Sequence, residues 1–134
     1  MSSSATLARW IVEKGIDNID PSMLSDELKK EVLTDAGMMF FKEGRLLDAI
    51  KCLKTANNPD KLLELGDEFM RQNRFEQAAL CYIPAGDRQR TEKVAEICLK
   101  EEKHKLAYES FLAAGNDKMA FFLRENFLEE IYSL

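Results

Sequence analysis

Few side chains in this sequence have the type and spacing that catalysis or metal binding would require. His104 is the only histidine, and no second histidine or cysteine stands where it could complete a metal site. Paired carboxylates, such as Glu101–Glu102 and Glu129–Glu130, fall on helix faces that we expect to be solvated, whereas acid–base catalysis needs a carboxyl group tuned by a desolvated pocket. Glycine-rich phosphate loops are absent from the sequence. We therefore expect no enzyme activity, no cofactor and no metal site, and we interpret His104 as a packing or surface residue.

The three cysteines are the remaining reactive groups. Cys52, Cys81 and Ser110 are evenly spaced along the chain, so this recurring position accepts a small residue. An odd number of cysteines without metal-like spacing is typical of free thiols in a reducing compartment. The sequence therefore predicts inert thiols in the core and a cytoplasmic protein.

Composition and charge indicate the broad class of protein. The chain has 134 residues, of which 46% are hydrophobic and 32% are charged, which is typical of one soluble globular domain. No apolar run approaches the roughly 18–20 residues that span a bilayer, and the N-terminal segment lacks the features of a secretory signal. The net charge of −5 argues against a general nucleic-acid binder, because phosphate contacts need a positive field.

The elements that must position these side chains are predicted to be helices throughout. Apolar residues recur every three or four positions, no segment alternates as a strand would, and residues that favour helices are common. Glycine and proline divide the chain at Gly15, Pro21, Gly44, Pro59, Gly86 and Gly115. The clearest hairpin is predicted to consist of a helix over 59–71, a tight turn at 72–74 and a second helix over 75–85.

The chain repeats itself without a gap, at the interval that separates Gly37 from Gly66. In this register, equivalent positions hold the small residues Gly37, Gly66 and Ala95, the alanines Ala49, Ala78 and Ala107, and the large residues Leu53, Tyr82 and Phe111. The small residues are expected to let the two helices of a hairpin approach closely, beside aromatic rings such as those of Phe69 and Tyr82. Because one hairpin cannot bury such a face alone, neighbouring hairpins must stack.

Local signals mark the helix ends of each copy. Asn58, Asp87 and Asn116 are equivalent, and each can cap the helix that follows it. Pro84 cannot donate a hydrogen bond to the carbonyl of Leu80, so it should loosen the last turn of its helix. We interpret Pro84 as a tolerated proline near a helix end.

The middle copy resembles the tetratricopeptide repeat. The residues that match the family's pattern are Leu65, Gly66, Phe69, Ala78, Tyr82 and Ala85. Two family positions differ, since the tryptophan position holds Leu33, Leu62 and Thr91, and the final proline position holds Lys61, Arg90 and Met119. The period of about 29 is shorter than the family's period of about 34, which is similar to the compact hairpins of intraflagellar-transport and coat-type solenoid proteins. The resemblance covers about residues 30–116 and implies a right-handed α-solenoid of stacked antiparallel hairpins.

This resemblance implies a single domain over 1–134 with capped ends. We divide it into an N-terminal cap (4–29), three repeats (30–57, 58–86 and 87–115) and a C-terminal capping helix (116–134). Within the N-terminal cap, Asp20 and Pro21 are expected to restart a helix. At the other end, apolar residues must cover the third hairpin or stay partly exposed, namely Phe121, Phe122, Phe127, Leu128 and Ile131. Self-association through the C-terminal helix is a further candidate.

Two repeated surfaces are candidates for binding. In the tetratricopeptide family the first helices line a concave groove, where apolar residues and pliable methionine would suit a peptide or helix, although some of these residues could instead pack between hairpins. The corresponding positions here are Met38, Phe41, Lys42, Leu63, Asp67, Met70, Arg71, Glu92, Glu96, Leu99 and Lys100. The family's clamp for a C-terminal carboxylate needs Lys and Asn at these positions, so we do not extend it to this chain.

The second surface, which we call the basic edge, consists of Lys42, Arg45, Arg71, Arg74, Lys100 and Lys103. Positive charge is favoured near helix C-termini, so this edge is typical of solvated residues, or it could meet an acidic protein or a phosphate backbone. We predict a non-catalytic protein–protein interaction or assembly module that binds a peptide or helix in its groove. The alternatives are nucleic-acid or acidic-partner binding through the basic edge, and a regulatory or accessory domain of a larger enzyme assembly.

Overall fold

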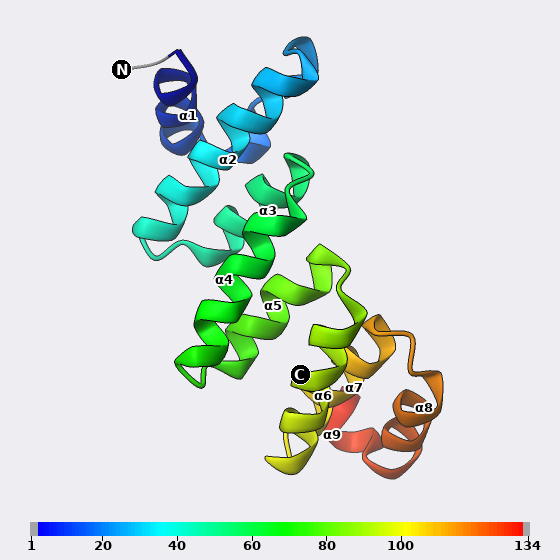
Figure 1. Ribbon diagram of the computed structural model, residues 1–134. Coiled ribbons are helices and arrows are strands. Elements are labelled where there is room, and N and C mark those ends of the chain that lie inside the picture. The colour runs from blue at the N-terminus through cyan, green and yellow to red at the C-terminus, as the bar shows by residue number, and fades with distance from the viewer. Residues whose placement is uncertain (1–2, 133–134) are drawn as a thin grey trace. The chain divides into compact units, whose positions relative to one another are not determined.

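The computed structural model describes residues 3–132, and every regular element within them is a helix (Figure 1). The all-α prediction is therefore confirmed. The described residues form two compact units, and the boundary between Leu62 and Leu63 falls inside helix α4 (Pro59–Arg71). The stacking of the hairpins into a solenoid and their grouping into one domain stay predictions.

The first unit is built around helix α2. It contains α1 (Ser3–Lys14), α2 (Asp26–Lys42) and α3 (Leu46–Thr55), with the short 3-10 helices η1 (Ile16–Asn18) and η2 (Pro21–Met23) between α1 and α2. Helix α2 packs against both α1 and α3. The buried core that joins these helices is apolar and includes Ala8, Ile11, Val32, Leu33, Ala36, Phe40, Ala49 and Cys52.

The segment before α2 differs from the sequence expectation. Asp20 and Pro21 begin only the short helix η2, in which Asp20 Oδ1 accepts a hydrogen bond from Ser22 N at 2.9 Å. The α-helix itself begins later, where the Ser25 hydroxyl accepts a hydrogen bond from Leu28 N at 3.2 Å. A side-chain cap at Ser25 satisfies a free amide of the first turn, which explains why α2 begins at Asp26.

The second unit contains the rest of α4 and five further helices of the described chain. They are α5 (Phe75–Ala85), α6 (Arg88–Lys100), α7 (His104–Ala113), α8 (Asp117–Asn126) and α9 (Leu128–Tyr132). Consecutive helices from α5 to α9 pack against each other, and α9 also packs against α7. The buried side chains come from all of these helices and include Phe69, Cys81, Tyr82, Val94, Cys98, Phe111, Leu123 and Ile131.

The backbone repeats with the same interval as the sequence. Helices α4 and α5 have the predicted bounds, with the turn at 72–74 between them. Residues with a positive φ recur at this interval, first at Gly15, Gly44, Asn73 and Glu102, and again at Asn57, Gly86 and Gly115. The left-handed conformation ends a helix without requiring glycine at every copy. The positions of the turns are therefore the same in each copy, whereas the residue at the turn can be glycine, asparagine or glutamate.

The predicted caps form, and two of them reach the preceding copy. The side chains of Asn58, Asp87 and Asn116 each accept a hydrogen bond from the backbone amide three residues on, at 2.9–3.2 Å. Asn58 Nδ2 also donates to Thr34 Oγ1 at 3.1 Å, and Asn116 Nδ2 donates to Glu92 Oε1 at 2.7 Å. One side chain thus caps its own helix and ties that helix to the residue 24 positions earlier.

Gly37 and Gly66, two of the small residues of the repeat, lie at close helix contacts, as predicted. A Cβ atom added at Gly37 would lie 3.1 Å from Leu53 Cγ and 3.2 Å from the carbonyl oxygen of Ala49. A Cβ atom added at Gly66 would lie 2.6 Å from Tyr82 Cδ1, which is shorter than the van der Waals contact distance between two carbon atoms. Glycine at 66 therefore lets α4 and α5 approach around an aromatic side chain.

The end of the second unit departs from the predicted single capping helix. Helix α8 ends at Asn126, Phe127 leaves the helical conformation with φ −131° and ψ 38°, and α9 begins at Leu128. The Phe127 ring stacks on His104 with 3.7 Å between the ring centroids, so a tertiary contact accounts for the break. Pro84 does not shorten α5, which continues to Ala85 and ends at Gly86 with φ 75°.

Candidate functional site

The predicted groove residues lie on α2, α4 and α6. Among them, the residues that are partly buried are Met38, Phe41, Leu63, Asp67, Met70, Glu92 and Leu99. The exposed ones are Lys42, Arg71, Glu96 and Lys100. Met38, Phe41 and Lys42 belong to the first unit, and the other predicted residues belong to the second. In the second unit, the structure brings two of them, Asp67 and Met70, to one hollow.

This hollow has a volume of about 250 Å³ and is lined by Asp67, Met70, Tyr82, Arg90 and Lys93. We call it the α4–α6 hollow, because α4 and α6 contribute four of its five lining residues. The predicted groove residues Glu92, Glu96, Leu99 and Lys100 do not line it. The hollow therefore contains two of the predicted groove residues, and the predicted groove itself stays a prediction.

A network of hydrogen bonds forms one wall of the α4–α6 hollow. Arg90 donates from Nε to Asp67 Oδ1 at 2.9 Å and from Nη2 to Asp67 Oδ2 at 3.1 Å, which is a bidentate ion pair. Arg90 Nη1 also donates to Asp87 Oδ2 at 2.9 Å, and the Tyr82 hydroxyl donates to Asp67 Oδ1 at 2.5 Å. Three helices, α4, α5 and α6, are therefore held at fixed positions around Asp67.

Electrostatics keep this network ionised. The hydrogen bonds from Arg90 hold the pKa of Asp67 below its usual value, and the backbone amide of Arg90 does the same for the pKa of Asp87. Burial, together with the hydrogen bond to Asp67, raises the pKa of the Tyr82 hydroxyl. Because Asp67 is already ionised and Tyr82 stays protonated near neutral pH, the network fixes geometry and is poorly suited to exchange protons with a ligand.

Sequence reasoning missed Arg90 and Lys93, and one signal was present. At the equivalent junctions, Asn58 and Asn116 donate to Thr34 and Glu92, which both carry an acceptor oxygen. The middle junction has Leu63 at that position, which cannot accept a hydrogen bond. The tie is instead made by Arg90 to Asp67, across 23 residues.

The basic edge is exposed in both units, and most of its charges have neighbours of opposite charge or aromatic rings. Arg45 and Arg74 lie over Phe40 and Phe69, with the guanidinium carbon 4.5 Å and 5.0 Å from the respective ring centroid. Arg45 also pairs with Asp48, Arg71 with Glu68, and Lys103 with Glu76 and Glu101. These contacts reduce the positive field that a polyanion would require.

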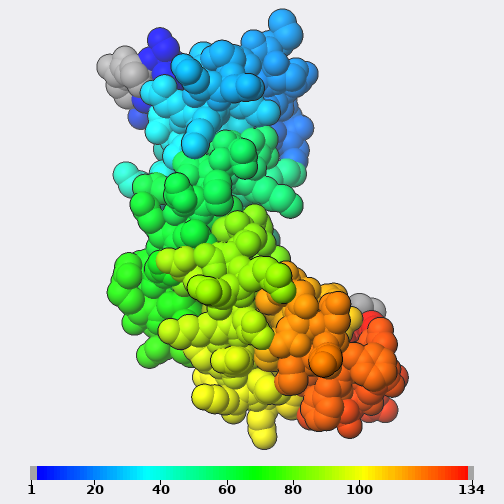
Figure 2. Space-filling view, turned by 45° about the vertical axis from the view of Figure 1, so that its right-hand side comes forward, coloured from blue at the N-terminus to red at the C-terminus, as the bar shows by residue number. Residues whose placement is uncertain are grey.

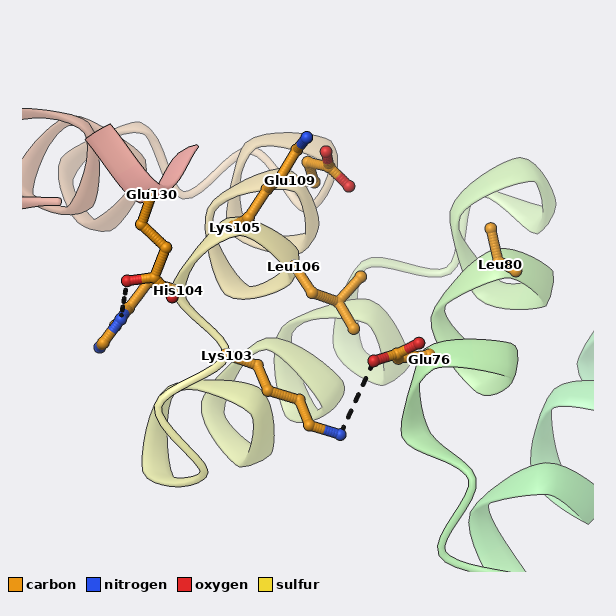
Figure 3. A pocket seen from close by; sticks show the side chains of 8 residues that line it. All are labelled: Glu76, Leu80, Lys103, His104, Lys105, Leu106, Glu109 and Glu130. Atoms are coloured by element: carbon orange, nitrogen blue, oxygen red, sulfur yellow. Dashed lines mark hydrogen bonds and ion pairs between the residues drawn. The ribbon is translucent and has the colours of Figure 1, made fainter. Parts of the chain in front are cut away.

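A second hollow, of about 350 Å³, surrounds the start of α7 (Figure 3). It is lined by residues of α5, α7 and α9 and by Lys103, which precedes α7, namely Glu76, Leu80, Lys103, His104, Lys105, Leu106, Glu109 and Glu130. His104 Nδ1 lies 2.7 Å from Glu130 Oε2, and its ring stacks on Phe127. The histidine therefore holds the segment around α9 against α7, which agrees with its prediction as a packing residue.

The thiols are free and buried, as predicted. Cys52, Cys81 and Cys98 form no disulfide. Burial raises the pKa of Cys52 and of Cys81 to about 12, and the pKa of Cys98 to about 11. Each thiol is thus protonated at neutral pH, and the thiolate that reacts with electrophiles or metals is scarce.

The described residues contain no cluster of three or more His, Cys, Asp or Glu side chains that could hold a metal ion. Within residues 3–132, no helix combines the length and apolar character that crossing a membrane requires. The chain matches no protein-family model, no curated protein and no solved structure.

Proposed function

We propose that this chain is a non-catalytic protein–protein interaction module that holds a peptide or helix at the α4–α6 hollow. The observation that supports the proposal is the composition of this hollow: a rigid network around Asp67, an apolar rim residue in Met70 and a positive charge in Lys93. Binding sites for peptides commonly combine a pliable apolar anchor with a few fixed polar groups. The hollow offers both within one unit.

The lining residues also indicate the chemistry of the ligand. Met70 is partly buried, and its unbranched side chain can adapt to an apolar residue of a partner. Lys93 is exposed and makes no ion pair within residues 3–132, whereas Arg90 is already held by two carboxylates. We therefore propose that the ligand places an apolar side chain against Met70 and a carboxylate near Lys93.

A random peptide library displayed on phage, selected against the full chain, tests this proposal. Binding of the enriched peptides would be measured by fluorescence polarisation with the parent and with variants. We expect Met70→Ala to lose about 1–3 kcal/mol of binding free energy, and Lys93→Glu to weaken peptides that carry an acidic residue. Met119→Ala is the matched control, because Met119 is also partly buried but does not line the hollow. Peptides that bind Met70→Ala as tightly as the parent would contradict the proposal.

The finer architecture belongs to the same proposal. The recurrence of left-handed residues and caps at the interval of the sequence repeat supports a tetratricopeptide-like solenoid of stacked hairpins. Three buried thiols without a disulfide support a reducing, cytoplasmic setting. Nucleic-acid binding through the basic edge has less support, because Arg45, Arg71 and Lys103 are paired with carboxylates. No contact favours a role as an accessory domain of an enzyme.

A further inference from the structure

Helix α8 breaks the repeat at the positions that face a neighbouring helix. The small residues Gly37, Gly66 and Ala95 receive the second helix of a hairpin in the earlier copies, and the equivalent position in α8 is Arg124. Phe121 likewise takes the position of Thr34, Leu63 and Glu92. An arginine cannot admit a helix at the distance that glycine allows, so this face of α8 is suited to a different contact.

The face consists of an apolar hollow with one charge at each end. Its volume is about 270 Å³, and it is lined by Tyr108 and Leu112 from α7 and by Asp117, Ala120, Phe121 and Arg124 from α8. Leu112 is 50% exposed and Phe121 is 57% exposed, so two large apolar side chains meet water here. The atoms of α8, orange to red in Figure 2, lie at the surface of the second unit. Exposed apolar side chains beside a hollow are typical of an interaction surface.

The charges make this face complementary to itself. Asp117, Phe121 and Arg124 stand at positions i, i+4 and i+7 of α8 and form one stripe along the helix. Asp117 and Arg124 are about 10 Å apart along the axis at the helical rise, and Phe121 lies near the midpoint between them. If a second α8 is laid antiparallel across this midpoint, each Asp117 meets the Arg124 of the other copy. The same rotation brings the two Phe121 side chains together at the axis, and in each copy the guanidinium carbon of Arg124 lies 5.2 Å from the centroid of the Phe121 ring.

We propose that this face binds a second copy of this chain, with the two α8 helices antiparallel about a two-fold axis near Phe121. Asp117 pairs with Arg124 across the axis, and the two Phe121 rings pack against each other between the two hollows. Residues of opposite charge at about equal distances from the midpoint favour this occupant over a ligand of a single charge sign. The pairing requires Arg124 to leave the Phe121 ring and Glu125 Oε1, which lies 3.5 Å from its Nη2. The contact does not use the α4–α6 hollow, so it stands or falls independently of peptide binding there.

Sedimentation equilibrium of the full chain measures this association. One helix and part of another on each copy make a small interface, so we expect a weak dimer, with Kd on the order of 10–100 μM. Phe121→Ala should weaken the dimer at least about tenfold, since it removes the apolar residue at the centre of the contact. Phe122→Ala is the matched control, because Phe122 is 52% exposed on the same helix but does not line the hollow.

Charge reversal distinguishes the proposed geometry from other dimers. Asp117→Arg alone places two arginines opposite each other, and Arg124→Asp alone places two aspartates opposite each other, so each variant should lose at least about tenfold in affinity. An equimolar mixture of the two variants restores both ion pairs, and we expect a heterodimer within about threefold of the parent's affinity. Recovery in the mixture also shows that both variants fold. A parent that stays monomeric at about 1 mM, or a mixture that associates no better than either variant alone, would overturn the proposal.

Discussion

The hairpins α2–α3 and α4–α5 share a backbone but fill it with different side chains. In each, a glycine of the first helix faces the second helix, and Gly37 meets the aliphatic Leu53 where Gly66 meets the ring of Tyr82. The Tyr82 hydroxyl reaches past the packing contact to Asp67, and Asp67 connects to Arg90. Leu53 has no such polar group. The repeat thus sets the path of the chain, and the hydroxyl group of Tyr82, which Leu53 lacks, links the core of the second unit to the α4–α6 hollow.

The largest effect should come from adding a methyl group at each of the two glycines. Gly66→Ala places its Cβ 2.6 Å from Tyr82 Cδ1, and overpacking of this kind costs about 1–3 kcal/mol of unfolding free energy, of which the helix preference of alanine offsets about 1 kcal/mol. Gly37→Ala has the same offset but needs only Leu53 and the Ala49 carbonyl oxygen to move by a few tenths of an ångström, so we expect the smaller loss at Gly37. Urea denaturation of both variants measures the difference.

A second substitution shows whether the Tyr82 ring causes this cost. In a Tyr82→Leu background, alanine at position 66 should become neutral or stabilising, since the side chain then resembles Leu53 in the other hairpin. The placement of Gly66 would be wrong if Gly66→Ala raised the stability of the chain while Tyr82 was intact.

The position shared by Cys52, Cys81 and Ser110 extends the comparison to α7. Ser110 is fully buried, and its hydroxyl has no hydrogen-bond partner among residues 3–132. A buried hydroxyl without a partner is costly, so Ser110→Ala should stabilise the chain by about 1 kcal/mol in urea denaturation. Ser110→Cys should also stabilise the chain if the space around position 110 in α7 is as large as the space around Cys52 in α3 and Cys81 in α5. A loss of stability in both variants would show that the hydroxyl is satisfied by water.

The two asparagine caps give a smaller and opposite pair of effects. Asn58→Asp keeps the cap, adds a charge that the helix N-terminus favours, and can accept a hydrogen bond from the Thr34 hydroxyl. Asn116→Asp keeps the same cap, but it replaces the amide that donates to Glu92 Oε1 with a second carboxylate, and the two negative charges then repel each other. We expect Asn58→Asp to be neutral or slightly stabilising, and Asn116→Asp to cost about 0.5–1 kcal/mol at neutral pH. Thermal unfolding at low and high salt would show the repulsion weakening as salt rises.

Much of the hairpin geometry could be predicted from the sequence because its causes are local. The bounds of α4 and α5 follow from apolar spacing and from Asn58 and Pro59 at the helix start. The close contact at Gly66 follows from the pairing of small and aromatic residues along the repeat. These signals lie within one or two turns of the residues that they position, so the sequence pattern carries them directly.

The rest depends on side chains that meet across long stretches of the chain. The pattern around Phe127 continues as a helix would, whereas in the structure Phe127 stacks on His104 and Glu130 contacts the same histidine, at the start of α7. The α4–α6 hollow depends on how far Arg90 reaches toward Asp67, which spacing alone cannot show. Residue types predicted the helices that carry the site, and tertiary contacts decided which of the predicted groove residues lie together.

The thiols should show the smallest difference between the two hairpins. Cys52 and Cys81 are both fully buried, and burial raises the pKa of each to about 12, so their reaction with a thiol reagent at pH 8 should be slow and similar in the native chain. Denatured, unreduced protein should show three reactive thiols per chain.

The same thiols should make the stability of the chain depend on pH. Because the folded pKa values lie above the unfolded value of about 8.5, the folded chain binds more protons at high pH, and its stability should fall as the pH rises from about 8.5 toward 12. Cys52→Ala and Cys81→Ala should each reduce this fall by a similar amount. A native chain in which Cys81 reacts much faster than Cys52 would show that α5 opens more readily than α3, and the two hairpins would then differ in dynamics as well as in packing.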